Sequence, residues 1–118
     1  MKPRFSVIIP TYRPNAWLQK SVESVLEQGL PEDDVQVLVC VNGSDRDYYN
    51  QLRTELTVPG VEVYYTPNPG QGAGRNLGLT KARNELLLFL DDDDVLERGV
   101  LDAVSGAFAD PKVNMVIV

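Results

Sequence analysis

Five short runs of apolar residues are spaced along the chain, and the stretch after each of the first four has the periodicity of a helix. The runs cover residues 5–9, 35–41, 61–65, 85–90 and 113–118. Each run is apolar apart from one polar residue, which is typical of strands that are buried on both faces of a sheet. Turn residues such as Pro10, Pro67 and Pro69 close the runs and support these boundaries.

Four helices are predicted between the strands, because apolar residues recur there at steps of three and four. Asn15 is a candidate N-cap for the first, which Gly29 ends, and Ser44 is a candidate N-cap for the second, with Asp47 completing a partial capping box. A glycine-rich turn precedes the third, and Asp110-Pro111 stops the fourth. The residues that mark the four helices are, in order, Trp17, Leu18, Ser21, Val22, Val25 and Leu26; Tyr48, Leu52 and Leu56; Arg75, Leu77, Lys81 and Ala82; and Val100, Leu101, Val104 and Phe108.

The alternation of strands and helices predicts an α/β fold, a Rossmann-like and mostly parallel sheet with helices on both faces. At 118 residues the chain is expected to form one domain, 1–118, or part of one. The last six residues have the pattern of a buried strand and are not followed by polar residues, so we expect a truncated fold. A strand left without its natural neighbour tends to pair with another chain, which leaves a homodimer open.

The composition of the chain limits its possible partners, metal sites and catalytic groups. The formal net charge is −6, so a nucleic-acid partner is not expected. There is no histidine, and Cys40 is the only cysteine, so a disulfide, a thiolate cluster and histidine-based catalysis are excluded within this chain. No stretch is long and apolar enough to span a membrane or to serve as a signal peptide. We therefore expect a cytoplasmic protein and leave open a peripheral membrane association of a full-length parent.

Polar residues gather where the predicted strands end. Pro10, Thr11 and Tyr12 follow the first strand, residues 42–45 follow the second, and four aspartates at 91–94 follow the fourth. In open parallel sheets, ligands bind at the carboxyl ends of the strands. These three segments are therefore expected to meet at one rim.

The four aspartates at 91–94 are the sharpest signal. Two carboxylates about 4 Å apart repel by about 1 kcal/mol in water and by several times that near a protein surface. Mg²⁺ or Mn²⁺ would remove this repulsion by binding one or two carboxylates together with phosphate oxygens. The alternative is a solvated acidic loop that caps the next helix.

The other rim residues are ambiguous on their own. Tyr12 could stack on a base or simply pack, and Asn42-Gly43 could be a plain turn. The glycines at 70–74 do not fit the dinucleotide-binding spacing, so we reject that interpretation. Arg75 could reach a diphosphate or could be an ordinary surface residue.

Four segments together resemble the family 2 glycosyltransferases, which adopt the A-type glycosyltransferase fold. They are SVIIPTYRP (6–14), LVCVNGSD (38–45), GAGRNLGL (72–79) and LLFLDDDDVL (87–96). The resemblance implies that the chain is the nucleotide-sugar-binding part of such an enzyme. A UDP-sugar is the favoured donor, and Mn²⁺ or Mg²⁺ is the implied cofactor.

The resemblance also assigns roles residue by residue. Pro10, Thr11 and Tyr12 match positions that contact the nucleoside, and Tyr12 would stack on the base. Asn42 stands where many members have an aspartate that binds the base, which puts the identity of the base in doubt. Arg75 matches an arginine near the diphosphate. Asp93, with Asp91, is expected to bind the metal, and Asp91 or Asp92 is expected to face the ribose.

The reaction implied is transfer of a sugar to an acceptor hydroxyl with inversion at the anomeric carbon. The general base is expected beyond residue 118, so the catalytic residue and the acceptor stay unknown. Two alternatives remain open. One is a half-domain that binds nucleotide and metal without catalysis, and the other is a haloacid-dehalogenase-type phosphatase with Asp91 as nucleophile and Asp93 as acid.

Overall fold

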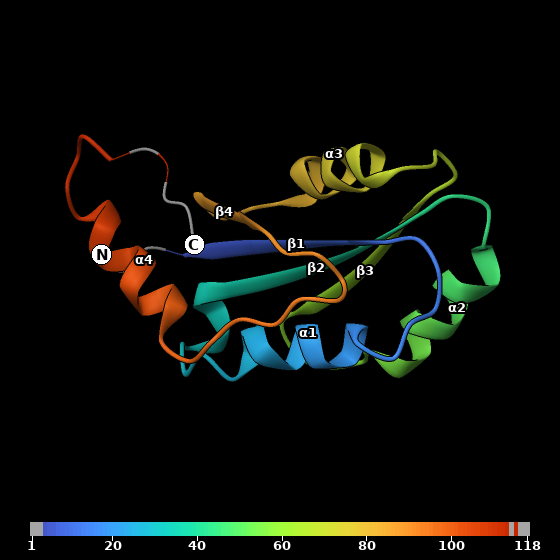
Figure 1. Cartoon of the computed structure of the whole chain (residues 1–118), viewed down its shortest axis with the longest axis horizontal. Helices are drawn as coiled ribbons and strands as arrows, with labels where there is room; N and C mark the ends of the chain where they lie inside the picture. The colour runs from blue at the N-terminus through green and yellow to red at the C-terminus, as the bar shows by residue number, and fades with distance from the viewer. Residues whose placement is uncertain (1–3, 114, 116–118) are drawn as a thin grey trace.

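The computed structural model describes residues 4–113 and 115, and in it four strands form one parallel sheet (Figure 1). The strands are β1 (Phe5–Thr11), β2 (Val35–Asn42), β3 (Val61–Thr66) and β4 (Leu86–Phe89). Their order across the sheet is β3-β2-β1-β4, and every neighbouring pair is parallel. The predicted α/β fold with a parallel sheet is therefore confirmed.

Helices cover both faces of the sheet (Figure 1). The helical elements are α1 (Leu18–Leu26), the short 3₁₀ helix η1 (Glu32–Asp34), α2 (Arg46–Glu55), α3 (Gln71–Lys81) and α4 (Val100–Phe108). α3 lies on one face, and α1 and α2 lie on the other. Among the helices of the described residues, none has the length and apolar character needed to cross a membrane.

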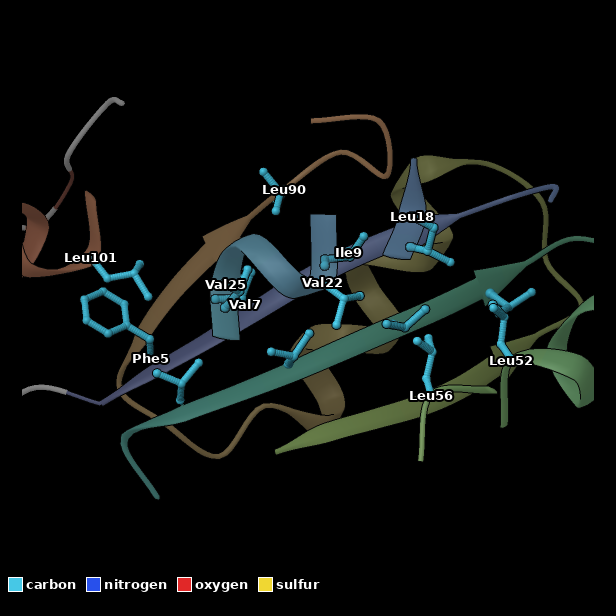
Figure 2. Packing of buried hydrophobic residues seen from close by; sticks show 14 of the residues in the cluster. Phe5, Val7, Ile9, Leu18, Val22, Val25, Leu52, Leu56, Leu90 and Leu101 are labelled. Atoms are coloured by element: carbon cyan, nitrogen blue, oxygen red, sulfur yellow. The ribbon is translucent and has the colours of Figure 1, made fainter. Parts of the chain in front are cut away.

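The larger hydrophobic cluster lies between β1, β2 and the helices on the α1 side. Alternate residues of β1 point towards α1, as Figure 2 shows for Phe5, Val7 and Ile9. The facing residues of α1 are Leu18, Val22 and Val25, all at most 3% exposed. Every residue of β1 and β2 is buried, which explains why these two strands have no polar alternation.

On the α3 side the packing depends on glycine. A Cβ built on Gly78 would lie 2.8 Å from Cγ1 of Ile8 and closer still to its Cγ2, and a Cβ on Gly74 would lie 2.8 Å from Cβ of Pro10. Both glycines are buried inside α3. Gly74 and Gly78 therefore let the helix backbone lie directly on β1.

Two sequence expectations change in detail, and a third stays untested. β1 continues through Pro10 to Thr11 rather than stopping at the proline, with Pro10 paired with Cys40 of β2. α2 begins at Arg46, and its N-cap is Asp45 rather than Ser44, because Asp45 Oδ1 accepts a hydrogen bond from the Tyr48 amide at 2.9 Å. The strand predicted at 113–118 falls largely outside the described residues, so it stays a prediction.

Candidate functional site

The acidic loop, residues 90–99 between β4 and α4, starts at the carboxyl end of the sheet. The Leu90 amide donates to the Ile8 carbonyl at 3.0 Å, which extends the pairing of β1 and β4 up to the first aspartate. Thr11 Oγ1, at the end of β1, then donates to Asp92 Oδ2 at 2.8 Å. The two segments that the sequence placed at one rim therefore touch.

Three of the four aspartates share one side of a tight turn. The Asp94 amide donates to the Asp91 carbonyl at 3.1 Å, which closes the turn. One carboxylate oxygen each from Asp91, Asp93 and Asp94 lies within 4.8 Å of the others, and the last two side chains are exposed. The sequence interpretation included Asp94 in the acidic run but named only Asp93 and Asp91 for the metal, since which members of a four-residue run point together depends on the turn.

This oxygen cluster fits a hard divalent cation. An octahedral ion with metal–oxygen distances of about 2.1 Å separates its ligands by about 3 Å when they are adjacent and about 4.2 Å when they are opposite. The spacing of the three carboxylates is close to this range, and small rotamer changes would close it. Oxygen donors without sulfur or imidazole favour magnesium or manganese.

Asp92 faces into the protein instead. Its Oδ2 accepts hydrogen bonds from Thr11 Oγ1 and Asn15 Nδ2, both at 2.8 Å. Thr11 also shares a 2.8 Å hydrogen bond with the hydroxyl of Tyr48. Burial raises the pKa of Tyr48, so its phenol stays protonated around neutral pH. Asp92 therefore joins the acidic loop to β1, the start of α1 and α2.

Asn42 is buried beneath the rim, with 1% of its surface exposed. Its Nδ2 donates to the Thr11 carbonyl at 3.2 Å, and its Oδ1 accepts from the Gly70 amide at 3.0 Å. Asn42 thus holds the ends of β1 and β2 against the start of α3. Its contact with a nucleotide base stays a prediction. In this structure both the oxygen and the nitrogen of its side-chain amide hydrogen-bond to the backbone.

Tyr12 lies on the surface of the rim and is 50% exposed. Its ring packs against Gly43, whose φ of +105° favours glycine and where an added Cβ would lie 2.9 Å from Tyr12 Cε2. The Arg13 guanidinium carbon is 5.1 Å from the ring centroid. An exposed aromatic ring supported by a glycine turn is available for stacking, whereas Pro10 and Thr11 are buried at its base.

Arg75 reaches the acidic loop from α3. Its Nη2 lies 3.8 Å from Asp91 Oδ1, and its guanidinium carbon lies 5.7 Å from the Phe89 ring centroid. Among the described residues, its buried Nε has no hydrogen-bond partner. Arg75, Phe89, Asp91 and Asp94 line one side of a cleft of about 590 Å³ along β4. A guanidinium cation therefore lies beside the carboxylates at the edge of this cleft.

The family comparison decides the class of the protein. The family described as "Glycosyl transferase family 2" matches residues 6–118, nearly the whole chain. This chain belongs to glycosyl transferase family 2. The resemblance stated from the four sequence segments is thus confirmed, and the family match favours a transferase over the phosphatase alternative.

Several curated family 2 members are similar to this chain. The poly(ribitol-phosphate) β-N-acetylglucosaminyltransferase TarS of Staphylococcus aureus (strain Mu50) is 30% identical over 101 residues, which are 83% of this chain and 18% of TarS. The GalNAc(5)-diNAcBac-PP-undecaprenol β-1,3-glucosyltransferase of Campylobacter jejuni is 30% identical over 86% of this chain and 33% of that protein. The chain therefore spans a third or less of the length of these two relatives.

Solved family structures share the fold. A crystal structure of S. aureus TarS 1–349 in complex with UDP-GlcNAc superposes with a TM-score of 0.73 at 25% identity, over 98% of this chain and 36% of that one. The mannosyltransferase PcManGT of Pyrobaculum calidifontis, in complex with GDP-Man and Mn²⁺, gives a TM-score of 0.79 at 24% identity, over 96% of this chain and 34% of that one. The sheet and helices described above are thus those of an A-type glycosyltransferase fold.

Proposed function

We propose that this chain forms the donor-binding part of a glycosyltransferase that takes a sugar from a UDP-sugar, with Mn²⁺ or Mg²⁺ as cofactor and with inversion at the anomeric carbon. The observation that carries the proposal is the convergence of three features at one rim: the carboxylates of Asp91, Asp93 and Asp94, the guanidinium of Arg75, and the exposed ring of Tyr12.

Each group has a role that its position supports. Asp91, Asp93 and Asp94 would hold the cation, and a bound divalent cation would neutralise negative charge on the departing diphosphate. Arg75 would donate to a phosphate oxygen, exchanging its weak 3.8 Å pairing with Asp91 for a charge-assisted hydrogen bond. Tyr12 would stack on the uracil ring.

The base and sugar preferences rest on relatives. TarS has been solved with UDP-GlcNAc, and PcManGT with GDP-Man and Mn²⁺. The UDP preference follows TarS, whose sequence is also similar to this chain. Asp92 is proposed to approach the ribose through Oδ1, because the hydrogen bonds that its side chain makes within the described residues all end at Oδ2.

Other properties of the whole protein are proposals of the same kind. The acceptor is a hydroxyl compound, and the general base is proposed to come from outside residues 1–118. A cytoplasmic location and a homodimer remain predictions from the sequence. For the chain as it stands, the testable activity is binding of nucleotide and metal.

A thermal-shift experiment tests the proposal. The chain is heated with UDP, GDP and UDP-GlcNAc, each with and without Mn²⁺. A ligand at about 100 times its Kd stabilises the folded state by about 2.7 kcal/mol. We expect a clear rise in Tm with UDP and Mn²⁺ together and little rise with either alone. No rise with any nucleotide in the presence of Mn²⁺ would refute the proposal.

The matched control uses two exposed aspartates, one after the carboxyl end of β4 and one before the amino end of β2. Asp93→Asn removes a carboxylate of the proposed metal site, and Asp33→Asn removes one in η1, which precedes the amino end of β2. Both changes alter the net charge equally. We expect only Asp93→Asn to abolish the Mn²⁺-dependent rise, so an equal loss in both variants would point to nonspecific charge effects.

A further inference from the structure

One face of α1 is polar and lies against the acidic loop. Ser21, Ser24 and Gln28 are spaced at i, i+3 and i+7, which places them on one side of the helix and its C-terminal extension. Ser21 is completely buried. Ser24 and Gln28 are partly buried. Polar groups removed from water are costly unless they find hydrogen-bond partners, so the partners of these three residues indicate their purpose.

The partners are backbone groups of the acidic loop. Ser21 Oγ lies 3.1 Å from the Asp92 carbonyl oxygen and 2.5 Å from that of Asp94, each within donating distance. Ser24 Oγ accepts from the Leu96 amide at 3.0 Å and donates to the Ser21 carbonyl at 2.7 Å. Ser21 has one hydroxyl hydrogen, so it donates to one carbonyl at a time. The two hydroxyls therefore lie against the loop backbone at residues 92, 94 and 96.

Gln28 continues the same pattern. Its Nε2 donates to the Glu97 carbonyl at 2.8 Å and to the Ser24 carbonyl at 3.0 Å. Its Oε1 accepts from the Leu101 amide at 3.1 Å, in the first turn of α4. The clamp of Ser21, Ser24 and Gln28 thus runs along the loop from the aspartates to α4.

The loop depends on tertiary contacts for its shape. Its first part is held by Thr11 and Asn15 through Asp92, and between β4 and α4 it has turns at residues 92–93 and 98–99 but no helix or strand. A metal site made of three carboxylates, two of them exposed, binds tightly only if their backbone is already held in the binding conformation. A site populated for a fraction of the time binds with an apparent affinity lowered by that fraction.

We propose that Ser21, Ser24 and Gln28 are positioning residues that hold the acidic loop in its metal-binding conformation. This inference rests on the proposed function. It assigns a role to this polar face of α1, which the metal and nucleotide contacts leave unexplained. The clamp acts only on backbone groups of the loop, so it sets where the carboxylates of Asp91, Asp93 and Asp94 stand without touching the cation.

The experiment measures Mn²⁺ affinity in the presence of UDP, by electron paramagnetic resonance of free Mn²⁺, in four α1 variants. Ser24→Ala and Gln28→Ala each remove backbone contacts to the loop, and alanine preserves the helix. Losing one such hydrogen bond is expected to weaken Mn²⁺ binding about five-fold. Ser24→Thr keeps a hydroxyl that can make the same contacts and is expected to restore the affinity. Gln19→Ala is the matched control, because Gln19 is exposed on α1 and, within the part of the chain that the structure describes, its side chain hydrogen-bonds to Glu23 alone.

A second readout separates positioning from general stability. Amide hydrogen exchange of Leu96 is expected to accelerate in Ser24→Ala, and that of Leu101 in Gln28→Ala, while the amides of β1 and β2 keep their protection. Unchanged Mn²⁺ affinity in both alanine variants, with Asp93→Asn still abolishing binding, would overturn the clamp and leave the proposed function standing. Absence of Mn²⁺ binding in the unaltered chain would overturn both.

Discussion

The contact between α3 and β1 makes Gly78→Ala the most informative single change for the fold. Gly78 is buried in α3, and an added Cβ would lie 2.8 Å from Ile8 Cγ1 and closer to Cγ2. Ile8 is completely buried in the central part of the sheet, so it has little room to move. The added methyl group must therefore push α3 away from the sheet or force Ile8 from its rotamer.

The size of the effect follows from two opposing contributions. Adding a methyl group to a tightly packed core costs about 1–3 kcal/mol, and this contact is at the upper end of that range. Replacing glycine by alanine inside a helix returns about 1 kcal/mol. The net loss is expected to be about 2 kcal/mol. For a domain of this size that corresponds to a Tm about 8 °C lower.

Gly106→Ala is the matched control for this change. Gly106 is in the interior of α4 and exposed, with nothing within 4 Å of an added Cβ. Only the helix-propensity gain applies, so Tm should rise by about 2–4 °C. Both variants are measured by urea and thermal unfolding. Equal stability of the Gly78 and Gly106 variants would refute the close helix–sheet packing.

Three further predictions concern the rim and the opposite end of the sheet. Tyr12→Ala should weaken UDP binding at least five-fold by calorimetry, and Tyr12→Phe should not, since the ring rather than the hydroxyl stacks; equal losses in both would argue against stacking. Asn15→Ala should lower the free energy of unfolding by about 1–2 kcal/mol, because Asn15 Oδ1 accepts from the amides of Trp17 and Leu18 while Nδ2 donates to Asp92; an unchanged urea midpoint would contradict this. Burial raises the pKa of Glu62, but hydrogen bonds from Tyr64, Arg83 and Gln36 outweigh it, so the pKa is lowered from 4.5. The stability that Glu62 contributes is therefore present above about pH 4.5 and is lost as the pH falls through the lower folded pKa. Below pH 5, the free energy of unfolding measured with urea should fall less steeply in Glu62→Gln than in the unaltered chain.

The sequence predicted the sheet well because the strands carry their own signal. The runs at 5–9 and 35–41 are apolar on both faces, and only a sheet covered on both sides buries such strands. Boundaries were less certain where two residues could serve the same purpose. Ser44 and Asp45 are both good N-caps, and the turn after β2 presents Asp45 to the Tyr48 amide.

The packing role of the α3 glycines could not be predicted from the sequence. Gly74 and Gly78 are four residues apart and share one helix face, but their purpose becomes visible only when Pro10 and Ile8 are placed beneath them. Composition alone suggests a flexible turn. Contact between segments about 70 residues apart is a tertiary property, and local propensity does not encode it.

The sequence predicted where the acidic loop lies, but not which way each aspartate side chain points. Strand order puts the aspartates beside Thr11, as expected from the carboxyl ends of parallel strands. The turn from Asp91 to Asp94 then directs three carboxylates outwards and Asp92 inwards, towards Thr11 and Asn15. Neither the place of Asp94 in the carboxylate cluster nor Ser21 as a contact of the loop follows from residue type or spacing.

The most direct test of the central claim is paramagnetic broadening of assigned amide resonances by Mn²⁺ in the presence of UDP. We expect broadening centred on residues 91–94 that extends to Arg75 and to residues 11–13, and that weakens strongly in Asp93→Asn. Broadening centred on the acidic residues of η1, or the same pattern with and without UDP and Asp93, would contradict the claim that these carboxylates and the nucleotide share one metal.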